Sequence, residues 1–256
     1  SESGSADQNA LNGVYHYLDD ILVYDTKVRD VVLNCRIRKD ASTLSPDFIN
    51  SNGRGRFNKD QLVGMKKGYI TDWKISDETF VGVHSDQQWW QHYYSNGVTI
   101  SGIFDIEFKL PPVPSGTYEI RLGYTVNPER GVVQAYLNNK PCGIPVDLRM
   151  YGTDPNIGWI EDTEDEEENI ANDKAMHNRG YMKGMDCYRQ WDSDHTLRAN
   201  TNNLRRILVT QYLDSEETYR LRFRQVLDDP ECYLSFDFIE LCPKSVYGSP
   251  EGEDIY

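Results

Sequence analysis

The sequence predicts an all-β fold in which antiparallel sheets pack as a sandwich, with jelly-roll connections. Five or more segments alternate apolar and polar residues with a period of two, so one face should be apolar and the other solvated. Pro-, Gly- and Asn-rich turns separate them, and few long helices are indicated. At 256 residues the chain can form one large β domain or two smaller ones.

One short N-terminal helix is expected over residues 25–38. Asp25 or Thr26 can cap its first turn, and four apolar residues then recur at helical spacing. These are Val28, Val31, Val32 and Cys35. The polar, Gly-rich run that follows indicates an irregular connection, so we place a boundary near residue 45. Residues 1–44 would be a leader, a strand and the helix, and residues 45–256 the sandwich.

Period-two alternation marks the strands. Residues 102–110 and 117–126 alternate strictly, and the Pro-rich run 111–116 between them predicts a turn. Asn138 and Asn139 tolerate a positive φ and predict the tip of a hairpin over 132–146.

The same pattern returns late in the chain. Residues 205–213 and 219–227 flank the polar run 214–218 and predict a second hairpin, and residues 232–241 predict a further strand. Between the two sets, residues 150–203 form a long, polar, irregular insertion, which is where specificity is expected.

Charge and cysteine content exclude several classes. The formal net charge is −14, so a basic nucleic-acid-binding face is not expected. No apolar run approaches the roughly 18 residues that a membrane span needs. The five cysteines show no metal spacing, and we interpret them as small buried hydrophobic residues. No cofactor is expected.

Catalytic and metal-binding motifs are mostly missing. The sequence contains no HExxH, GxSxG, Walker loop or GxGxxG. Asp105 and Glu107 share a strand face, as a glycosidase pair would need, but they alternate with Lys109 on the solvated side. The acidic run 161–169 could attract Ca²⁺, although such runs are more often solvated loops. Asp192, Asp194 and His195 could be ligands, but an Asx-turn explains them more simply.

A positive stripe is predicted on one strand. Arg220, Arg222 and Arg224 recur with period two and could hold an anionic polymer. We favour pairing with acidic residues of a neighbouring strand.

Aromatic residues in polar loops give the clearest indication of function. Flat rings stack on the C–H faces of pyranoses, while amides and carboxylates satisfy the hydroxyls. Such rings occur in residues 86–97 and in the insertion, and the predicted ligand-binding residues are Trp89, Trp90, Tyr93, Tyr94 and Trp191. The alternative, equally weighted, is that one tryptophan anchors the loop on the core and the tyrosines cover an edge.

The opening stretch NGVYHYLDDIL resembles the closing strand of fasciclin domains over about residues 11–24. The residues that match this pattern are Asn12, Gly13, Val14, His16, Leu18, Asp19 and Leu22. The rest of a fasciclin domain is absent from this sequence.

Residues 117–152, 176–189 and 235–247 resemble the C-terminal β-sandwich of fasciclin-containing surface lipoproteins of gut bacteria. The layout is also similar to galactose-binding-like modules. The resemblance implies export and attachment to the outer membrane by a lipid outside this sequence. It also implies a glycan or cell-surface polysaccharide as partner, and an outer-membrane protein as a second one. The calcium ligands of related sandwich modules are not matched.

The sequence therefore predicts a non-catalytic carbohydrate-binding or adhesion module of a glycan-utilisation system. A structural or protein-interaction spacer is the alternative, and a glycoside hydrolase is the less favoured third.

Overall fold

The computed structural model describes residues 8–10, 13–15, 33–50, 61–85, 92–93, 96–189 and 192–249. The helical elements are η1 (Ala41–Thr43), α2 (Pro46–Asn50), α3 (Glu166–Asn178) and α4 (Lys244–Tyr247). The strands of the first half are β1 (Gln8–Ala10), β2 (Gly13–Tyr15), β3 (Ile37–Asp40), β4 (Gln61–Gly64), β5 (Lys74–Ile75), β6 (Thr79–Ser85), β7 (Asn96–Gly102), β8 (Asp105–Lys109) and β9 (Gly116–Thr125). Those of the second half are β10 (Val132–Leu137), β11 (Lys140–Pro141), β12 (Val146–Asp147), β13 (Tyr181–Lys183), β14 (Tyr188–Arg189), β15 (Asp192–Thr196), β16 (Asn203–Leu213), β17 (Arg220–Gln225) and β18 (Tyr233–Pro243).

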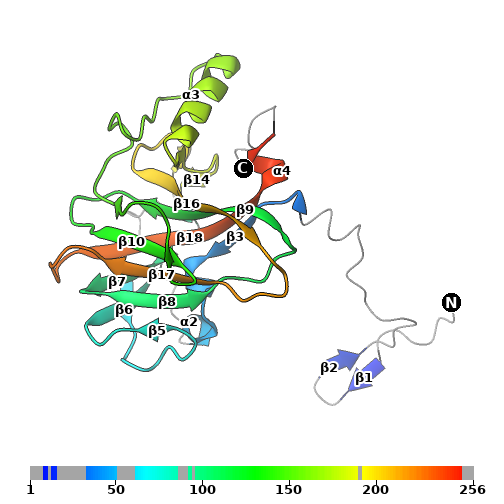
Figure 1. Cartoon of the computed structure of the whole chain (residues 1–256), viewed down its shortest axis with the longest axis vertical. Coiled ribbons are helices and arrows are strands. Elements are labelled where there is room, and N and C mark those ends of the chain that lie inside the picture. The colour runs from blue at the N-terminus through cyan, green and yellow to red at the C-terminus, as the bar shows by residue number, and fades with distance from the viewer. Residues whose placement is uncertain are drawn as a thin grey trace.

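Two antiparallel sheets form the body of the molecule (Figure 1). The larger sheet has the strand order β13-β16-β9-β18-β7-β6-β4, with β3 also paired to β18. The smaller sheet has the order β11-β10-β17-β8-β5, with β12 paired to β10. This arrangement confirms the predicted all-β, antiparallel sandwich.

Aromatic side chains fill the space between the sheets. The rings of Phe108 in β8 and Phe236 in β18 stack at 6.2 Å, and Phe223 in β17 lies 5.9 Å from each of them. Trp73 stacks on Phe108 at 4.8 Å. Phe108 and Phe223 lie on the predicted apolar faces, so alternation identified the inner face of both strands correctly.

The prediction of a solvated second face is wrong for the central strands of the larger sheet. Both faces of β9 and β18 are buried, and the outer face carries charged residues such as Arg121 and Glu240. Alternation predicts a solvated face because the residues on it are polar. Here these polar residues are buried instead, because they form ion pairs with one another beneath other segments of the chain.

The predicted second hairpin is also wrong. β16 pairs with β9 and β13 in the larger sheet, whereas β17 pairs with β10 and β8 in the smaller sheet. The run 214–218 therefore carries the chain from one sheet to the other. The first hairpin is confirmed, because Asn138 and Asn139 at its tip have φ values of 46° and 65°.

The N-terminal region is described in part. β1 and β2 pair as a short hairpin that includes Gly13 and Val14 of the fasciclin-like stretch. The remainder of that stretch and residues 25–32 of the predicted helix lie outside the described residues. In the described part the helix prediction is wrong at its end, because Ile37 and Arg38 belong to β3 and pair with β18. β3 belongs to the larger sheet although it precedes the boundary predicted near residue 45.

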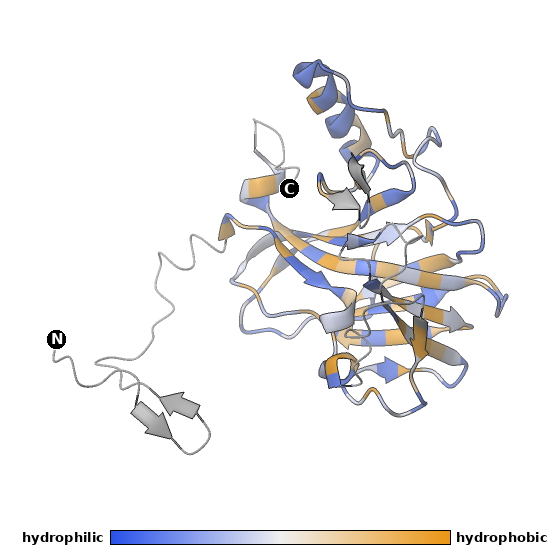
Figure 2. Ribbon diagram, turned by 180° about the vertical axis from the view of Figure 1, so that it is seen from behind, coloured by the Kyte–Doolittle hydropathy of each residue, from blue (hydrophilic) through white to orange (hydrophobic). Residues whose placement is uncertain are grey.

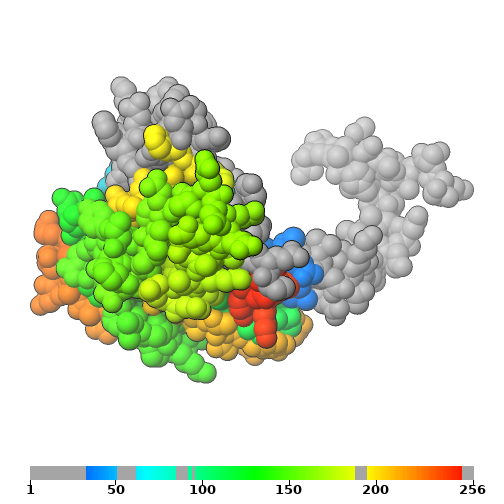
Figure 3. Space-filling model, turned by 90° about the horizontal axis from the view of Figure 1, so that it is seen from above, coloured from blue at the N-terminus to red at the C-terminus, as the bar shows by residue number. Residues whose placement is uncertain are grey.

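The insertion is more regular than expected. Residues 150–203 contain α3, β13 and the strand pair β14–β15. Asp165 caps α3, and Glu166, Glu167 and Glu168 occupy its first turn, where acidic side chains suit the helix dipole. Figure 2 shows α3 mostly in the hydrophilic colour, and in Figure 3 the insertion covers one end of the molecule. Among the described residues, no helix is both long and apolar enough to cross a membrane.

Candidate binding site

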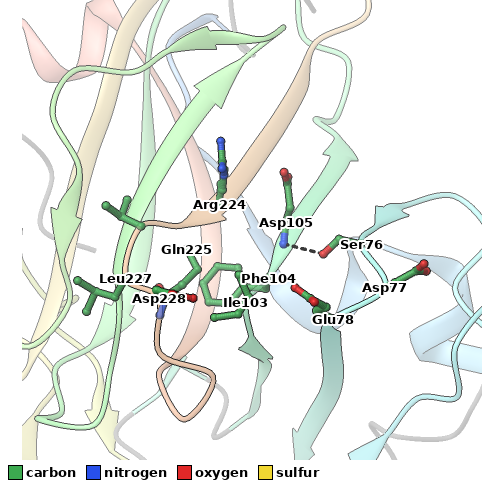
Figure 4. A pocket seen from close by; sticks show the side chains of 11 residues that line it. Ser76, Asp77, Glu78, Ile103, Phe104, Asp105, Arg224, Gln225, Leu227 and Asp228 are labelled. Atoms are coloured by element: carbon green, nitrogen blue, oxygen red, sulfur yellow. Dashed lines mark hydrogen bonds between the residues drawn. The ribbon is translucent and has the colours of Figure 1, made fainter.

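A depression of about 530 Å³ lies where several strands of both sheets end (Figure 4). We call it the end depression. Its walls come from the β5–β6 turn, the β7–β8 corner and the segment that begins at the end of β17. The lining residues are Ser76, Asp77, Glu78, Ile103, Phe104, Asp105, Arg224, Gln225, Val226, Leu227 and Asp228.

Local contacts hold two of these walls together. The Ser76 hydroxyl lies 2.6 Å from that of Thr79 and accepts a hydrogen bond of 3.2 Å from the Asp105 backbone N–H. Gly102 has a φ of +89°, and a Cβ there would lie 2.1 Å from the carbonyl oxygen of Glu78. Only glycine therefore allows the β7–β8 corner to approach the β5–β6 turn so closely.

Two of the carboxylates in the end depression are neutralised by ion pairs. Arg222 donates a hydrogen bond of 2.6 Å from Nε to Asp105, and its Nη2 contacts the second carboxylate oxygen. The Nζ of Lys67 lies 2.5 Å from the Oδ1 of Asp77 and lowers the pKa of that carboxyl group.

Three charged groups in the end depression have no such partner. Glu78, Asp228 and Arg224 are exposed, and no ion pair or side-chain hydrogen bond to another described residue involves them. Arg224 lies opposite Asp105 in the sheet, but Arg222 already occupies that carboxylate. These side chains are available to a ligand that both donates and accepts hydrogen bonds.

Apolar surface completes the end depression. Val226 is 50 % exposed, and Ile103 and Leu227, which line the same hollow, are half-buried. In Figure 4, Ile103 and Phe104 lie between the polar groups of the β5–β6 turn and those of the β17 side.

Most of the predicted aromatic site lies outside the described residues: Trp89, Trp90, Tyr94 and Trp191. Tyr93 is described and half-buried. Its ring meets that of Phe238 edge-on at 6.1 Å, the Arg38 guanidinium lies 5.4 Å from it, and its backbone N–H donates to Asp237 at 2.5 Å. Part of this ring is therefore used to anchor the loop to the sheet.

The described flanks of the aromatic segments meet on one apolar cluster. Met185, Leu197 and Phe238 form it on the larger sheet, and Tyr93 and Cys187 pack against it. Cys187 and Leu197 lie on either side of β14 and β15 in the chain, so Tyr93 and the two ends of this strand pair pack against the same cluster.

The other predicted chemistry has structural explanations. The preferred interpretation of the arginine stripe is confirmed for two of its three members, since Arg222 pairs with Asp105 and Arg220 lies 3.4 Å from Glu107. It is wrong for Arg224, because Arg222 already occupies the Asp105 carboxylate. Glu107 also lies 2.6 Å from Lys74. In the described part of the chain, no three His, Cys, Asp or Glu side chains are grouped so as to hold a metal ion. No disulfide links the five cysteines, all of which lie in the described part of the chain. Cys142, Cys232 and Cys242 are buried as expected, but Cys187 is half-buried and Cys35 is exposed, so the interpretation as buried residues is wrong for Cys35.

The sequence reasoning did not identify Glu78 or Asp228 as site residues. Each lies in a short polar turn, which is a weak signal by itself. Their common position depends on contacts between segments about 150 residues apart, and no local pattern encodes such contacts.

No protein-family model matches the sequence, and a search of curated proteins found no match. Similar solved structures include a Paenibacillus xanthan lyase, at 10 % identity and a TM-score of 0.35. That alignment covers 72 % of this chain and 12 % of the lyase. The catalytic domain of a GH87 α-1,3-glucanase in complex with nigerose is 11 % identical with a TM-score of 0.32, covering 80 % of this chain and 27 % of that one. The chain thus spans well under a third of either protein.

Proposed function

We propose that this protein is a non-catalytic carbohydrate-binding module, and that the end depression is its binding site. One observation carries the proposal: Arg224, Glu78 and Asp228 surround a single hollow without pairing with other described groups. Sugar hydroxyls donate and accept hydrogen bonds at once, so they can satisfy a guanidinium and two carboxylates together.

The apolar surface supports the same ligand class. A pyranose ring has C–H faces that need apolar contact beside the hydrogen-bonding groups. Val226, with Ile103 and Leu227 beside it, offers that contact in the end depression. Trp89, Trp90, Tyr93, Tyr94 and Trp191 remain a second predicted surface for stacking on a longer glycan.

The charge pattern favours binding over hydrolysis. A glycosidase needs one carboxyl group with a raised pKa as general acid and a second group at a defined separation. Of the four carboxyl groups that line the end depression, Asp105 is fixed by Arg222, and Lys67 shifts the pKa of Asp77 downward, opposite to that need. Glu78 and Asp228 are exposed rather than enclosed in the apolar pocket that a general acid needs.

We extend the proposal to the location of the protein. It is exported and held at the outer membrane by a lipid anchor outside this sequence, and it works beside an outer-membrane protein.

Equilibrium binding to a panel of immobilised neutral polysaccharides tests this function. We expect the wild type to bind at least one of them, and Arg224→Gln to weaken that binding about tenfold through loss of charged hydrogen bonds. Trp89→Ala and Trp90→Ala test the aromatic surface separately.

Arg220→Gln is the matched control, because Arg220 belongs to the same stripe but does not line the end depression. The affinity of this variant for the glycan should equal that of the wild type. Failure of the wild type to bind any glycan would instead favour the spacer function.

A further inference from the structure

We propose that the end depression selects uncharged glycans and rejects glycans that carry carboxylate or sulfate groups. This inference rests on the proposed function and names the substrate class of the same site. It follows from which charges in the end depression are neutralised and which are left for a ligand.

The two ion-paired carboxylates of the end depression favour neither anionic nor cationic ligands. Asp105 is held by Arg222 and Asp77 by Lys67, so each pair presents no net charge. A ligand anion in the hollow gains little from Arg222 or Lys67, because neither side chain lines the end depression and each lies against a carboxylate.

The unpaired charges leave the end depression negative. Glu78 and Asp228 contribute two negative charges, and Arg224 contributes one positive charge. A uronate or a sulfate that approached Arg224 would also face two carboxylates across the same hollow. Juxtaposed like charges are an effective means of rejecting a wrong ligand.

The net charge of the whole molecule also disfavours the binding of anionic glycans. Its formal net charge of −14 repels polyanions at distances up to the Debye length, which is about 8 Å at physiological salt. An uncharged polysaccharide experiences no such repulsion. Rejection of anionic glycans should therefore weaken as salt rises, whereas binding of neutral glycans should not change.

Two forms of one polysaccharide that differ only in charge test this selectivity. The neutral polysaccharide that the wild type binds is compared with the same polymer oxidised to carry carboxylates at C6, each immobilised at equal density. We expect the wild type to bind the carboxylated polymer at least about tenfold more weakly at 50 mM salt, and the difference to shrink at 500 mM.

The double variant Glu78→Gln/Asp228→Asn identifies the groups responsible. Both residues are exposed, so the variant should fold, and its circular dichroism should match that of the wild type. We expect the ratio of its affinity for the carboxylated polymer to its affinity for the neutral polymer to be about tenfold that of the wild type, and addition of Arg224→Gln to abolish that gain. Glu216→Gln/Glu217→Gln, at two exposed positions outside the end depression, is the charge-matched control and should produce no gain.

Two results would overturn the inference while leaving the proposed function intact. One is equal or tighter binding of the carboxylated polymer by the wild type, which would make Arg224 a carboxylate clamp. The other is a double variant that gains nothing. If the wild type binds neither form of any polysaccharide, the proposed function itself fails, and the inference fails with it.

Discussion

Glu240 is a fully buried carboxylate surrounded by arginines. Its Oε1 accepts a hydrogen bond of 2.8 Å from Arg121, and its Oε2 one of 2.7 Å from Arg38. Burial alone would raise the pKa of Glu240, but the guanidinium groups, with Arg205 the strongest, outweigh this and lower it to about 2. The outer face of β18 is therefore held by a charge network in which each partner depends on the others.

Replacement of Glu240 by glutamine should destabilise the fold strongly. Arg121 is 0 % exposed and would lose a charged partner that it cannot replace with water. We expect a loss of about 3 kcal/mol or more in the free energy of unfolding, measured by urea denaturation. Glu216→Gln at an exposed position should change it by less than about 0.5 kcal/mol. A loss in Glu240→Gln no larger than in this control would contradict the assigned network.

His84 provides a residue-level test that depends on pH. It is buried in β6 and its ring contacts the Thr99 hydroxyl. Burial and the charge of Arg130 lower its pKa to about 4, so the folded state keeps it neutral. The unfolded chain takes up the proton near pH 6.5, so the contribution of His84 is complete above pH 6.5 and is lost as pH falls toward 4.

The pH dependence of stability should therefore be smaller in His84→Gln. In the wild type this histidine adds a slope of at most about 1.4 kcal/mol per pH unit between pH 4 and 6.5, with stability rising with pH. Chemical denaturation at several pH values measures the slope. Parallel curves for the two proteins would show that His84 is not held neutral by the fold.

At the scale of elements, β9 and β18 come together at a glycine. A Cβ on Gly123 would lie 2.4 Å from the ring of Phe238, and these residues are cross-strand partners. Phe238 also belongs to the cluster against which Tyr93 packs, so the space left by the glycine helps to fix the contact between Tyr93 and the larger sheet.

Gly123→Ala should disturb both the strand pair and this anchor. We expect a loss of about 2 kcal/mol in the free energy of unfolding, because the ring must leave its position in a packed cluster. Thr210→Ala, at an exposed position of the neighbouring β16, is the control and should cost much less. Equal losses of unfolding free energy in the two variants would mean that the Phe238 ring moves aside at no cost.

Alternation of side chains predicted which segments are strands, but not all of their partners. The apolar faces of β8 and β17 were identified because their period is two. The polar run 214–218 has the composition of a hairpin turn, yet it connects two sheets, because alternation carries no information on pairing. α3 was missed because its acidic first turn and polar surface resemble a solvated loop.

At the scale of the whole molecule, the candidate site was less predictable than the fold. Arg224 was selected as one member of a stripe, and only the structure shows that Arg222 takes Asp105 and leaves Arg224 available. The other members of the site come from distant turns that the sandwich brings to one end. The packed sheets thus form the scaffold, and their connections supply the charges available to a ligand.

Hydrogen–deuterium exchange with and without the neutral glycan that the wild type binds tests the central claim most directly. If sugar occupies the end depression, amides of residues 76–78, 103–105 and 224–228 should gain protection together, because these segments line one hollow. Protection confined to other segments, with these three unchanged, would contradict the assignment of the end depression as the binding site.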